Sequence, residues 1–567
     1  REAGLQVGVS QPLIDDLAAG SSRTSEAVGL AVALVVLLVA LGSAWAAGVP
    51  IVTAVIGLLT GLAALDLVRH AVAVPTIVPT LATMLGLGVG IDYALFQVAR
   101  QGRSLREEED RVAAVARTAA TSGTAVAFAG VTVAVSICAL AITGVDFVSW
   151  LGWGTAIVVA VVLLGSLTLT PALLAVLGPR VAARRVRTDL DRTGWARFAG
   201  TVARRPWTAV AASTVLLAAL AAPAVSLTLG QSSDADWPLG SERRISYDLT
   251  TAQLGAGSNA VLQVALALDP AATAADDPRL TAVADQLAAV PGVTSVAQPT
   301  LATDGSAALL RVQPTTGAAD TATADVVAGL RAVETPAGVT LHVGGPTATR
   351  LDLSDRIAER LPWLVLVTVL VAAALLAFAF RSVVVPLKAA AMDLISVAAA
   401  YGVVTAVFEQ GWGAGLVGLD GPVAIDAYVP MMLFAVLFGL SMDYEVFLLS
   451  AVREHWLQTG DNTLAVRRGL AETGRIITAA ALIMFSVFAS FVLTDNPVIK
   501  VFGVGLAVAV AVDATVVRTV LGPAVMVLTG RWTWWWPGTR TAQVPPDPDD
   551  RATPVDETGA RVGPPAP

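Results

Sequence analysis

Two stretches of the chain decide its fold: GLGVGIDYALF at residues 86–96 and LFGLSMDYEVF at residues 437–447. Each lies within a long apolar run, and each places an aspartate followed by a tyrosine inside that run. Because an ionisable group is costly to bury in a bilayer, an intramembrane aspartate is a functional candidate by default. We therefore predict functional roles for Asp92 and Asp443, each in a membrane-spanning helix.

The composition around these stretches is that of a polytopic membrane protein. The 567 residues are 55% hydrophobic and only 14% charged, with a mean hydropathy of +0.71. A soluble domain carries about 25% charged residues, and a net charge of −8 argues against a nucleic-acid partner. A single cysteine, Cys138, excludes an internal disulfide framework and a cysteine-rich metal site.

Eleven apolar runs are long enough to cross a bilayer, which takes about 20 residues. They lie at approximately 27–46, 49–66, 76–98, 119–142, 154–177, 207–226, 362–380, 385–408, 427–451, 476–494 and 500–528. The loops at 99–118, 178–206 and 452–475 are rich in arginine, which places them in the cytoplasm by the positive-inside rule. The N-terminus is then expected outside and the C-terminal tail inside.

The only long polar stretch, residues 227–360, is predicted to lie outside the membrane. Its patterns alternate in the order β-α-β-β-α-β, which is the split, ferredoxin-like order of an α+β domain. Its acidic residues show no metal-ligand spacing. A binding or gating domain therefore fits this stretch better than a catalytic one.

The spans form two copies of one unit. Pro79, Gly88, Asp92 and Tyr93 each have an identical counterpart 351 residues later, whereas matches nearer the N-terminus are offset by 336 residues. The difference is an insertion in the glycine-rich outer loop 409–426. We predict a parallel repeat of five helices, of the kind found in transporters.

This repeat predicts the organisation of the whole chain. By comparison with the second copy, the first copy lacks a preceding membrane helix and most of an exterior domain, so a complete chain would have twelve spans and two exterior domains. The predicted segments are the end of a first exterior domain (1–26), the first repeat (27–177), a cytoplasmic arginine-rich linker (178–206), a single span (207–226), the exterior domain (227–360), the second repeat (361–530) and a cytoplasmic tryptophan anchor with a disordered tail (531–567).

An aspartate and the tyrosine that follows it do not face each other on one helix. If the two equivalent helices pack about a pseudo-twofold axis, the pairs can cross, so that Asp92 reaches Tyr444 and Asp443 reaches Tyr93. Burial disfavours the charged carboxylate and the tyrosine hydroxyl favours it, so such a site could load and release protons near neutral pH. The alternative is a purely structural hydrogen-bonded pair.

Three further polar residues are weaker candidates for relay support. Asp513 and Arg518 lie in the last span at i,i+5, where we expect no direct pairing on an α-helix, and Arg518 could instead mark the cytoplasmic end by snorkelling. Glu445 is as consistent with a structural role as with a functional one, and Asp393 is expected to be structural. No phosphate-binding loop or hydrolase motif occurs, so we predict no enzyme, no cofactor and no metal.

In combination, these features resemble the RND superfamily, and most closely its MMPL branch in actinobacteria. Besides the duplicated Asp-Tyr pair, the similar segments are RTAATSGTAVAFAG (117–130), AETGRIITAAALIMFSVFASFVL (471–493), AVDATVVRTVLGPA (511–524) and WTWWWPG (532–538). The resemblance implies a bacterial inner (plasma) membrane exporter of lipids or other hydrophobic molecules, driven by the proton-motive force. The family's proton relay maps onto Asp92, Tyr93, Asp443 and Tyr444, and its last-span pair onto Asp513 and Arg518.

The resemblance also implies the partners. Membrane lipids, protons and a hydrophobic substrate would contact the chain, no nucleic acid is expected, and envelope accessory proteins would fit an exporter. The alternatives are RND-type drug efflux, or a non-transporting module such as a sterol-sensing-like receptor or a protein-export accessory. The expected substrate path involves two exterior domains, of which this sequence holds one.

Overall fold

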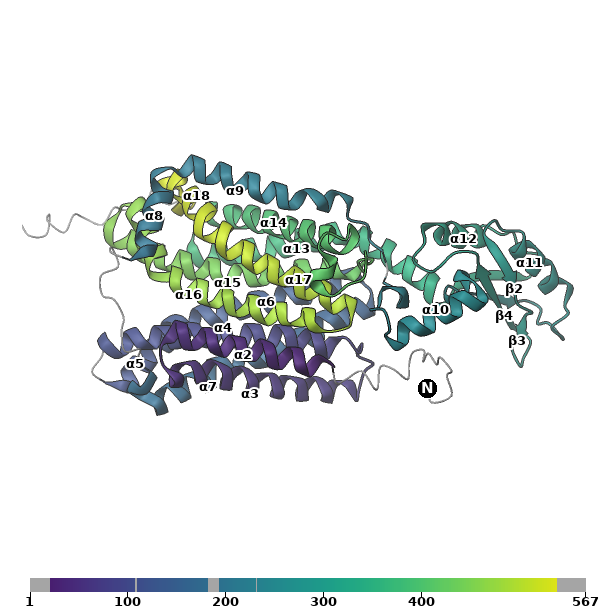
Figure 1. Cartoon of the computed structure of the whole chain (residues 1–567), viewed down its shortest axis with the longest axis horizontal. Helices are drawn as coiled ribbons and strands as arrows, with labels where there is room; N and C mark the ends of the chain where they lie inside the picture. The colour runs from purple at the N-terminus through teal and green to yellow at the C-terminus, as the bar shows by residue number, and fades with distance from the viewer. Residues whose placement is uncertain (1–20, 108–109, 182–192, 231, 538–567) are drawn as a thin grey trace, which may run out of the picture.

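A computed structural model describes residues 21–107, 110–181, 193–230 and 232–537. A bundle of long helices carries a smaller unit of helices and strands at one end (Figure 1). The predicted end of a first exterior domain lies largely outside the described residues, as do much of the linker 178–206 and the disordered tail.

The two repeats have matching helices. The first consists of α2 (Ser21–Leu41), α3 (Ala44–Arg69), α4 (Val78–Glu107), α5 (Arg111–Thr118), η2 (Ala119–Gly123), α6 (Thr124–Cys138), η3 (Ala139–Thr143) and α7 (Asp146–Leu177). The second consists of α13 (Pro346–Phe380), α14 (Val384–Val404), η9 (Thr405–Glu409), η10 (Ala414–Val417), α15 (Tyr428–Thr459), α16 (Asn462–Ser490), η11 (Phe491–Leu493), α17 (Pro497–Val512), η12 (Asp513–Leu521), α18 (Gly522–Thr529) and η13 (Gly530–Trp534). Between them lie η4 (Gly178–Val181), α8 (Gly194–Arg204), α9 (Pro206–Ala221) and η6 (Ala222–Ser226).

Within the described residues, ten helical stretches are long and apolar enough to cross a membrane. They coincide with ten of the eleven predicted spans, and Ser25–Leu41, at the position of the remaining one, is a shorter apolar helix. The polytopic helical fold is therefore confirmed, while the exact number of spans stays a prediction.

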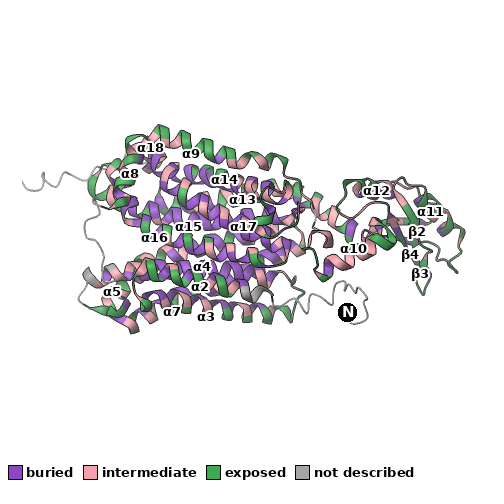
Figure 2. Ribbon diagram, in the orientation of Figure 1, coloured by how far each residue is buried: buried purple, intermediate pink, exposed green. Residues whose placement is uncertain are grey.

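Helices α4 and α15 form the centre of the bundle. The most apolar stretch of α4 is entirely buried and that of α15 is 94% buried, against 11% for the peripheral helix α9 (Figure 2). A helix that is apolar on all sides belongs in an interior, and these two helices carry the two Asp-Tyr pairs.

Small residues let the two repeats interlock. Helix α4 packs along α16 of the other repeat, and α15 packs along α6. A Cβ atom added at Gly439 would lie 2.9 Å from the backbone Cα of Val133 on α6, and one added at Gly88 would touch the ring of Phe488 on α16 at 3.4 Å. Glycine thus permits the close approach of helices that membrane packing requires.

This packing predicts the effect of a single methyl group. The substitution Gly439→Ala is expected to destabilise the bundle by about 1–3 kcal/mol, because the methyl group meets the α6 backbone rather than a flexible side chain. The matched control is Gly48→Ala in α3, where no atom lies within 4 Å of the added Cβ. Thermal unfolding of the detergent-purified proteins measures both, and equal melting temperatures for the two variants would contradict the packing.

The smaller unit, which we call the exterior unit after its predicted location, follows the predicted order of elements, with an additional helix before the first strand and one additional short strand. Its elements are η7 (Asp234–Asp236), α10 (Glu242–Leu254), η8 (Ala256–Asn259), β1 (Leu262–Leu268), α11 (Pro278–Ala288), β2 (Val293–Val296), β3 (Thr300–Leu301), β4 (Ala307–Pro314), α12 (Thr321–Arg331) and β5 (Val339–Gly344). The strand order is β2-β4-β1-β5, with antiparallel neighbours and β3 paired to β4. Strand β1 alternates buried and exposed residues, and its buried face packs against Leu280, Val283 and Leu287 of α11.

Candidate functional site

The two central helices bring the four predicted relay residues into the interior of the bundle. Asp92 and Tyr93 on α4, and Asp443 and Tyr444 on α15, are each at most 3% exposed. Both pairs lie in the interior of long helices, more than ten residues from either end. Neither bulk water nor lipid therefore surrounds these side chains.

The pairs face each other across the two repeats. The Tyr93 hydroxyl donates to Asp443 Oδ2 at 2.9 Å. Tyr444 faces Asp92 closely enough for its hydroxyl to interact with that carboxyl group, and the same hydroxyl lies 2.7 Å from Met484 Sδ. The structure thus brings together residues 350 positions apart in the arrangement that a crossed pair requires.

Each aspartate retains one carboxylate oxygen, Oδ1, that has no hydrogen-bond partner among the described residues. Burial of a charge is costly unless hydrogen bonds or an opposite charge compensate it. Binding of a proton removes that cost, and its release restores it. Two such carboxyl groups at the contact between two repeats are suited to holding and passing protons.

Arg518 pairs directly with Asp513, contrary to the expectation from their spacing. Its Nε donates to Asp513 Oδ2 at 2.6 Å, and only 1% of its side chain is exposed. The prediction was wrong because η12 is a π-helix, in which the repeat of i→i+5 brings these positions onto one face. Snorkelling of Arg518 to the cytoplasmic surface is also wrong, since the guanidinium is buried.

The same arginine joins the last span to α15, the helix that carries Asp443 and Tyr444. Its guanidinium carbon lies 4.8 Å from the centre of the Tyr444 ring. It also donates to the backbone carbonyl of Ser441, and to the Ser441 hydroxyl at 3.0 Å. π-helical turns occur frequently at functional sites, and this one places a permanent positive charge beside one member of the crossed pairs.

Glu445 forms a buried ion pair that the sequence did not reveal. Lys388 of α14 donates to its Oε1 at 2.6 Å, and both side chains are nearly inaccessible. Asp393, on the same helix as Lys388, accepts a hydrogen bond from the Ser441 hydroxyl. A lysine within an apolar span is the signal that could have identified this pair, because it must find a partner.

A small cavity lies among the buried polar side chains of α14, α15 and η12. It has a volume of about 20 Å³ and is lined by Asp393, Ser441, Tyr444 and Asp513, among others. One water molecule needs about 10–15 Å³ and several polar partners, so the cavity has the size and lining for one water. Within the described residues, no group of three His, Cys, Asp or Glu side chains could hold a metal ion.

The ion pair yields a test of whether Glu445 is structural. Lys388→Met leaves the glutamate buried without its partner and should lower the free energy of unfolding by about 3–5 kcal/mol, the typical cost of breaking a buried pair. Lys388→Met combined with Glu445→Gln removes both charges and should recover most of that stability. Thermal unfolding of the two variants provides the comparison. If the double variant is as unstable as the single one, the two charges do not act as a pair.

A second set of contacts attaches the exterior unit to the outer loop 409–426. We call the contacts between this loop and residues 226–241 the outer clasp. Ser232 donates through its backbone N and its hydroxyl to the two carboxylate oxygens of Asp426, at 2.7 and 2.9 Å, and Gly230 N donates to the carbonyl of Ile425 at 3.0 Å. Burial raises the pKa of the Asp426 carboxyl group. Asp426 lies two residues before α15, the helix that carries Asp443.

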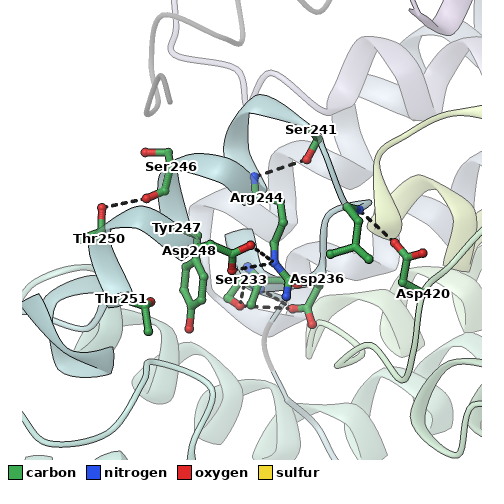
Figure 3. A network of polar contacts seen from close by, with 12 residues as sticks. Ser233, Asp236, Ser241, Arg244, Ser246, Tyr247, Asp248, Thr250, Thr251 and Asp420 are labelled. Atoms are coloured by element: carbon green, nitrogen blue, oxygen red, sulfur yellow. Dashed lines mark hydrogen bonds and ion pairs between the residues drawn. The ribbon is translucent and has the colours of Figure 1, made fainter. Parts of the chain in front are cut away.

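Polar contacts reinforce the clasp toward the exterior unit (Figure 3). Leu239 N donates to Asp420 Oδ2 at 2.9 Å, and the Thr228 hydroxyl donates to Glu409 at 3.1 Å. Arg244 of α10 pairs with Asp248 at 2.9 Å and donates to the carbonyl of Ala235. The insertion that distinguishes the second repeat from the first therefore contacts the base of the exterior unit.

The family model described as MMPL family matches residues 2–209 and 239–548. The chain belongs to the MMPL family. It is thus a multi-pass protein of the bacterial plasma membrane and a member of the RND superfamily, as the sequence resemblance predicted.

In relatives with curated names, about a third of the aligned residues are identical to those of this chain. The mycolic acid-containing lipids exporter MmpL11 of Mycolicibacterium smegmatis is 35% identical over 550 residues, covering 94% of this chain and 57% of that protein. The heme uptake protein MmpL11 of Mycobacterium tuberculosis H37Rv is 36% identical over 547 residues, covering 94% of this chain and 56% of that protein. The MMPL chain therefore spans a little over half the length of these relatives.

A solved structure shares the fold. The crystal structure of SecDF, a translocon-associated membrane protein from Thermus thermophilus, matches with a TM-score of 0.58 at 17% identity, covering 92% of this chain and 63% of that chain. At this identity the likeness concerns the architecture of the repeats alone.

Proposed function

We propose that this MMPL chain is the proton-coupled transport unit of a membrane exporter of lipids or other hydrophobic molecules. The observation that carries the proposal is the hydrogen bond from Tyr93 to Asp443, which joins the two repeats in the interior of the membrane-spanning bundle. Protonation of Asp443 would remove a buried charge and would change the strength of the Tyr93–Asp443 hydrogen bond, and with it the stability of the contact between the two repeats. A proton gradient could then bias the packing of one repeat against the other.

The outer clasp provides a route from the relay to the exterior unit. Asp426 accepts two hydrogen bonds from Ser232 at the base of the exterior unit. Two residues after Asp426 the chain enters α15. A shift of α15 along or about its axis would therefore be passed to the exterior unit through hydrogen bonds rather than through a loose linker. In this proposal the exterior unit moves the substrate while the relay supplies the energy.

The substrate class rests on the relatives. One is named as a lipid exporter and another as a heme uptake protein, and both names denote hydrophobic cargo. Lipid is the substrate that we propose first, because relatives named as exporters are named for lipids. Drug efflux and a non-transporting accessory role, the latter with the SecDF fold, are the alternatives that the experiments below separate.

Proton coupling is tested by neutral substitutions in the crossed pairs. In proteoliposomes with an imposed pH gradient, Asp92→Asn and Asp443→Asn should abolish both proton flux and export of a fluorescent lipid, because neither side chain can then release a proton. Tyr93→Phe should reduce the flux while leaving a residual rate, since the carboxyl groups remain.

The matched control for these variants is Ser450→Ala, on the same helix as Asp443, where the hydroxyl bonds only to the backbone of Val446. It should transport like the wild type. Unchanged lipid export in both asparagine variants would refute the relay, whereas an absence of lipid export by the wild type itself would favour a non-transporting module. If the asparagine variants lose export of a drug but keep export of the lipid, proton-coupled drug efflux is favoured.

Coupling through the outer clasp makes a separate prediction. Asp426→Ala removes both acceptors for Ser232 and should lower lipid export by at least about fivefold, the lower end of typical coupling free energies between sites. Asp426→Asn retains an acceptor for the Ser232 backbone N–H and should have a smaller effect. Proton binding at Asp92 and Asp443 should change in neither variant.

The control is Asp285→Ala, which removes an exposed carboxyl group of α11 away from the clasp. If Asp426→Ala and Asp285→Ala export equally well, the clasp does not transmit the movement.

A further inference from the structure

A groove of about 620 Å³ opens between α16, the last span and α8. Its walls include Leu482 and Phe485 from α16 and Thr515 and Thr519 from η12, and Trp195 and Phe198 of α8 also line it. Its volume falls in the range of small-molecule sites, about 300–1,000 Å³. The groove is almost wholly apolar apart from its threonines.

The arginine-rich loops lie at the same end of the bundle as α8, and the positive-inside rule places that end, and with it the groove, at the cytoplasmic leaflet. Helix α8 lies at the end of the bundle opposite the exterior unit (Figure 1), and α16 and the last span both cross the membrane. Leu482 is 49% exposed and Phe485 is 38% exposed. From Thr478 to Phe485 the α16 wall extends about 10 Å along the helix axis at 1.5 Å per residue. The groove is therefore open to lipid along part of one leaflet.

Helix α8 has the composition of a helix that lies in the membrane interface. Its sequence, GWARFAGTVAR, combines aromatic and basic residues and has no acidic residue. Its buried face packs on α16, where a Cβ atom added at Gly474 would lie 2.7 Å from the ring of Trp195. This close contact fixes α8 across the cytoplasmic end of the groove.

Positive charges lie at that same end. Arg197 is the neighbour of Phe198 on α8, and Arg475 precedes Thr478 by one turn on α16. Both arginines are exposed, and Arg475 uses one N–H group to donate to the backbone carbonyl of Ala40 at 2.8 Å, which leaves its other N–H groups for a ligand. Basic residues between membrane helices on the cytoplasmic side bind the headgroups of anionic lipids, so the charge complements a phosphate above an apolar groove.

One wall of the groove is the outer surface of the π-helical turn. Thr515 and Thr519 belong to η12, and so do Asp513 and Arg518, whose ion pair lies in the interior. A molecule in the groove therefore contacts the same short segment that positions the arginine beside Tyr444.

We propose that this groove is a binding site for an anionic phospholipid of the cytoplasmic leaflet, with one acyl chain between α16 and η12 and the phosphate at Arg197 and Arg475. The lipid is a resident of the membrane and not the exported cargo. This site does not depend on the proposed transport function, since lipid binding is measured directly.

Native mass spectrometry of the full chain released from nanodiscs of mixed phosphatidylglycerol and phosphatidylethanolamine tests the site. The wild type should retain one phosphatidylglycerol. Thr515→Trp and Thr478→Trp each place an indole in the groove and should weaken retention about tenfold, equivalent to about 1.4 kcal/mol. Replacement of both Arg197 and Arg475 by Ser should remove the preference for phosphatidylglycerol over phosphatidylethanolamine.

The control is Val215→Trp on α9, a β-branched residue that is 69% exposed to lipid outside the groove. It should retain lipid like the wild type. Phosphatidylglycerol with a photoreactive group in its acyl chain should label residues 478–485 and 511–519 above other lipid-facing segments. Equal retention by all three tryptophan variants, or labelling spread evenly over the spans, would overturn the proposal.

Discussion

The hydrogen bond between Tyr93 and Asp443 is the contact on which the rest of the structure depends. It requires that two helices from opposite ends of the chain meet in an interior without water, and that a carboxyl group be tolerated there. Both requirements are costly in a membrane protein. Gly88 and Gly439 let these two helices pack closely on α16 and α6 of the opposite repeat, and the polar cluster around Arg518 compensates part of the buried charge.

That cluster makes the two repeats unequal. In the second repeat a π-helical turn aligns Asp513 with Arg518, and Lys388 neutralises Glu445. The outer clasp adds to the difference, because it joins the inserted loop before α15 to the base of the exterior unit. Equivalent helices of the two repeats thus carry the crossed Asp-Tyr pairs, while the contacts that we propose to transmit a change at these pairs are concentrated on one of the two helices.

Much of this arrangement could be predicted from the sequence. Spans follow from hydropathy, and the duplicated Asp-Tyr pair indicates both the repeat and the crossed contact. The Arg518–Asp513 pair could not be predicted, because the α-helical spacing was assumed and only the structure shows the π-helical turn. The partner of Asp426 was equally hidden, since Ser232 lies 194 residues away and neither residue belongs to a recognisable motif.

The central claim is that the buried carboxyl groups bind and release protons as a crossed pair. Infrared difference spectroscopy of the purified chain across a pH titration observes the C=O stretch of a protonated carboxyl group directly. The account predicts a titrating band that is lost in Asp443→Asn and shifts in Tyr93→Phe, because the phenol donates to that carboxyl group. A band that does not change with pH, or that is the same in both variants as in the wild type, would contradict it.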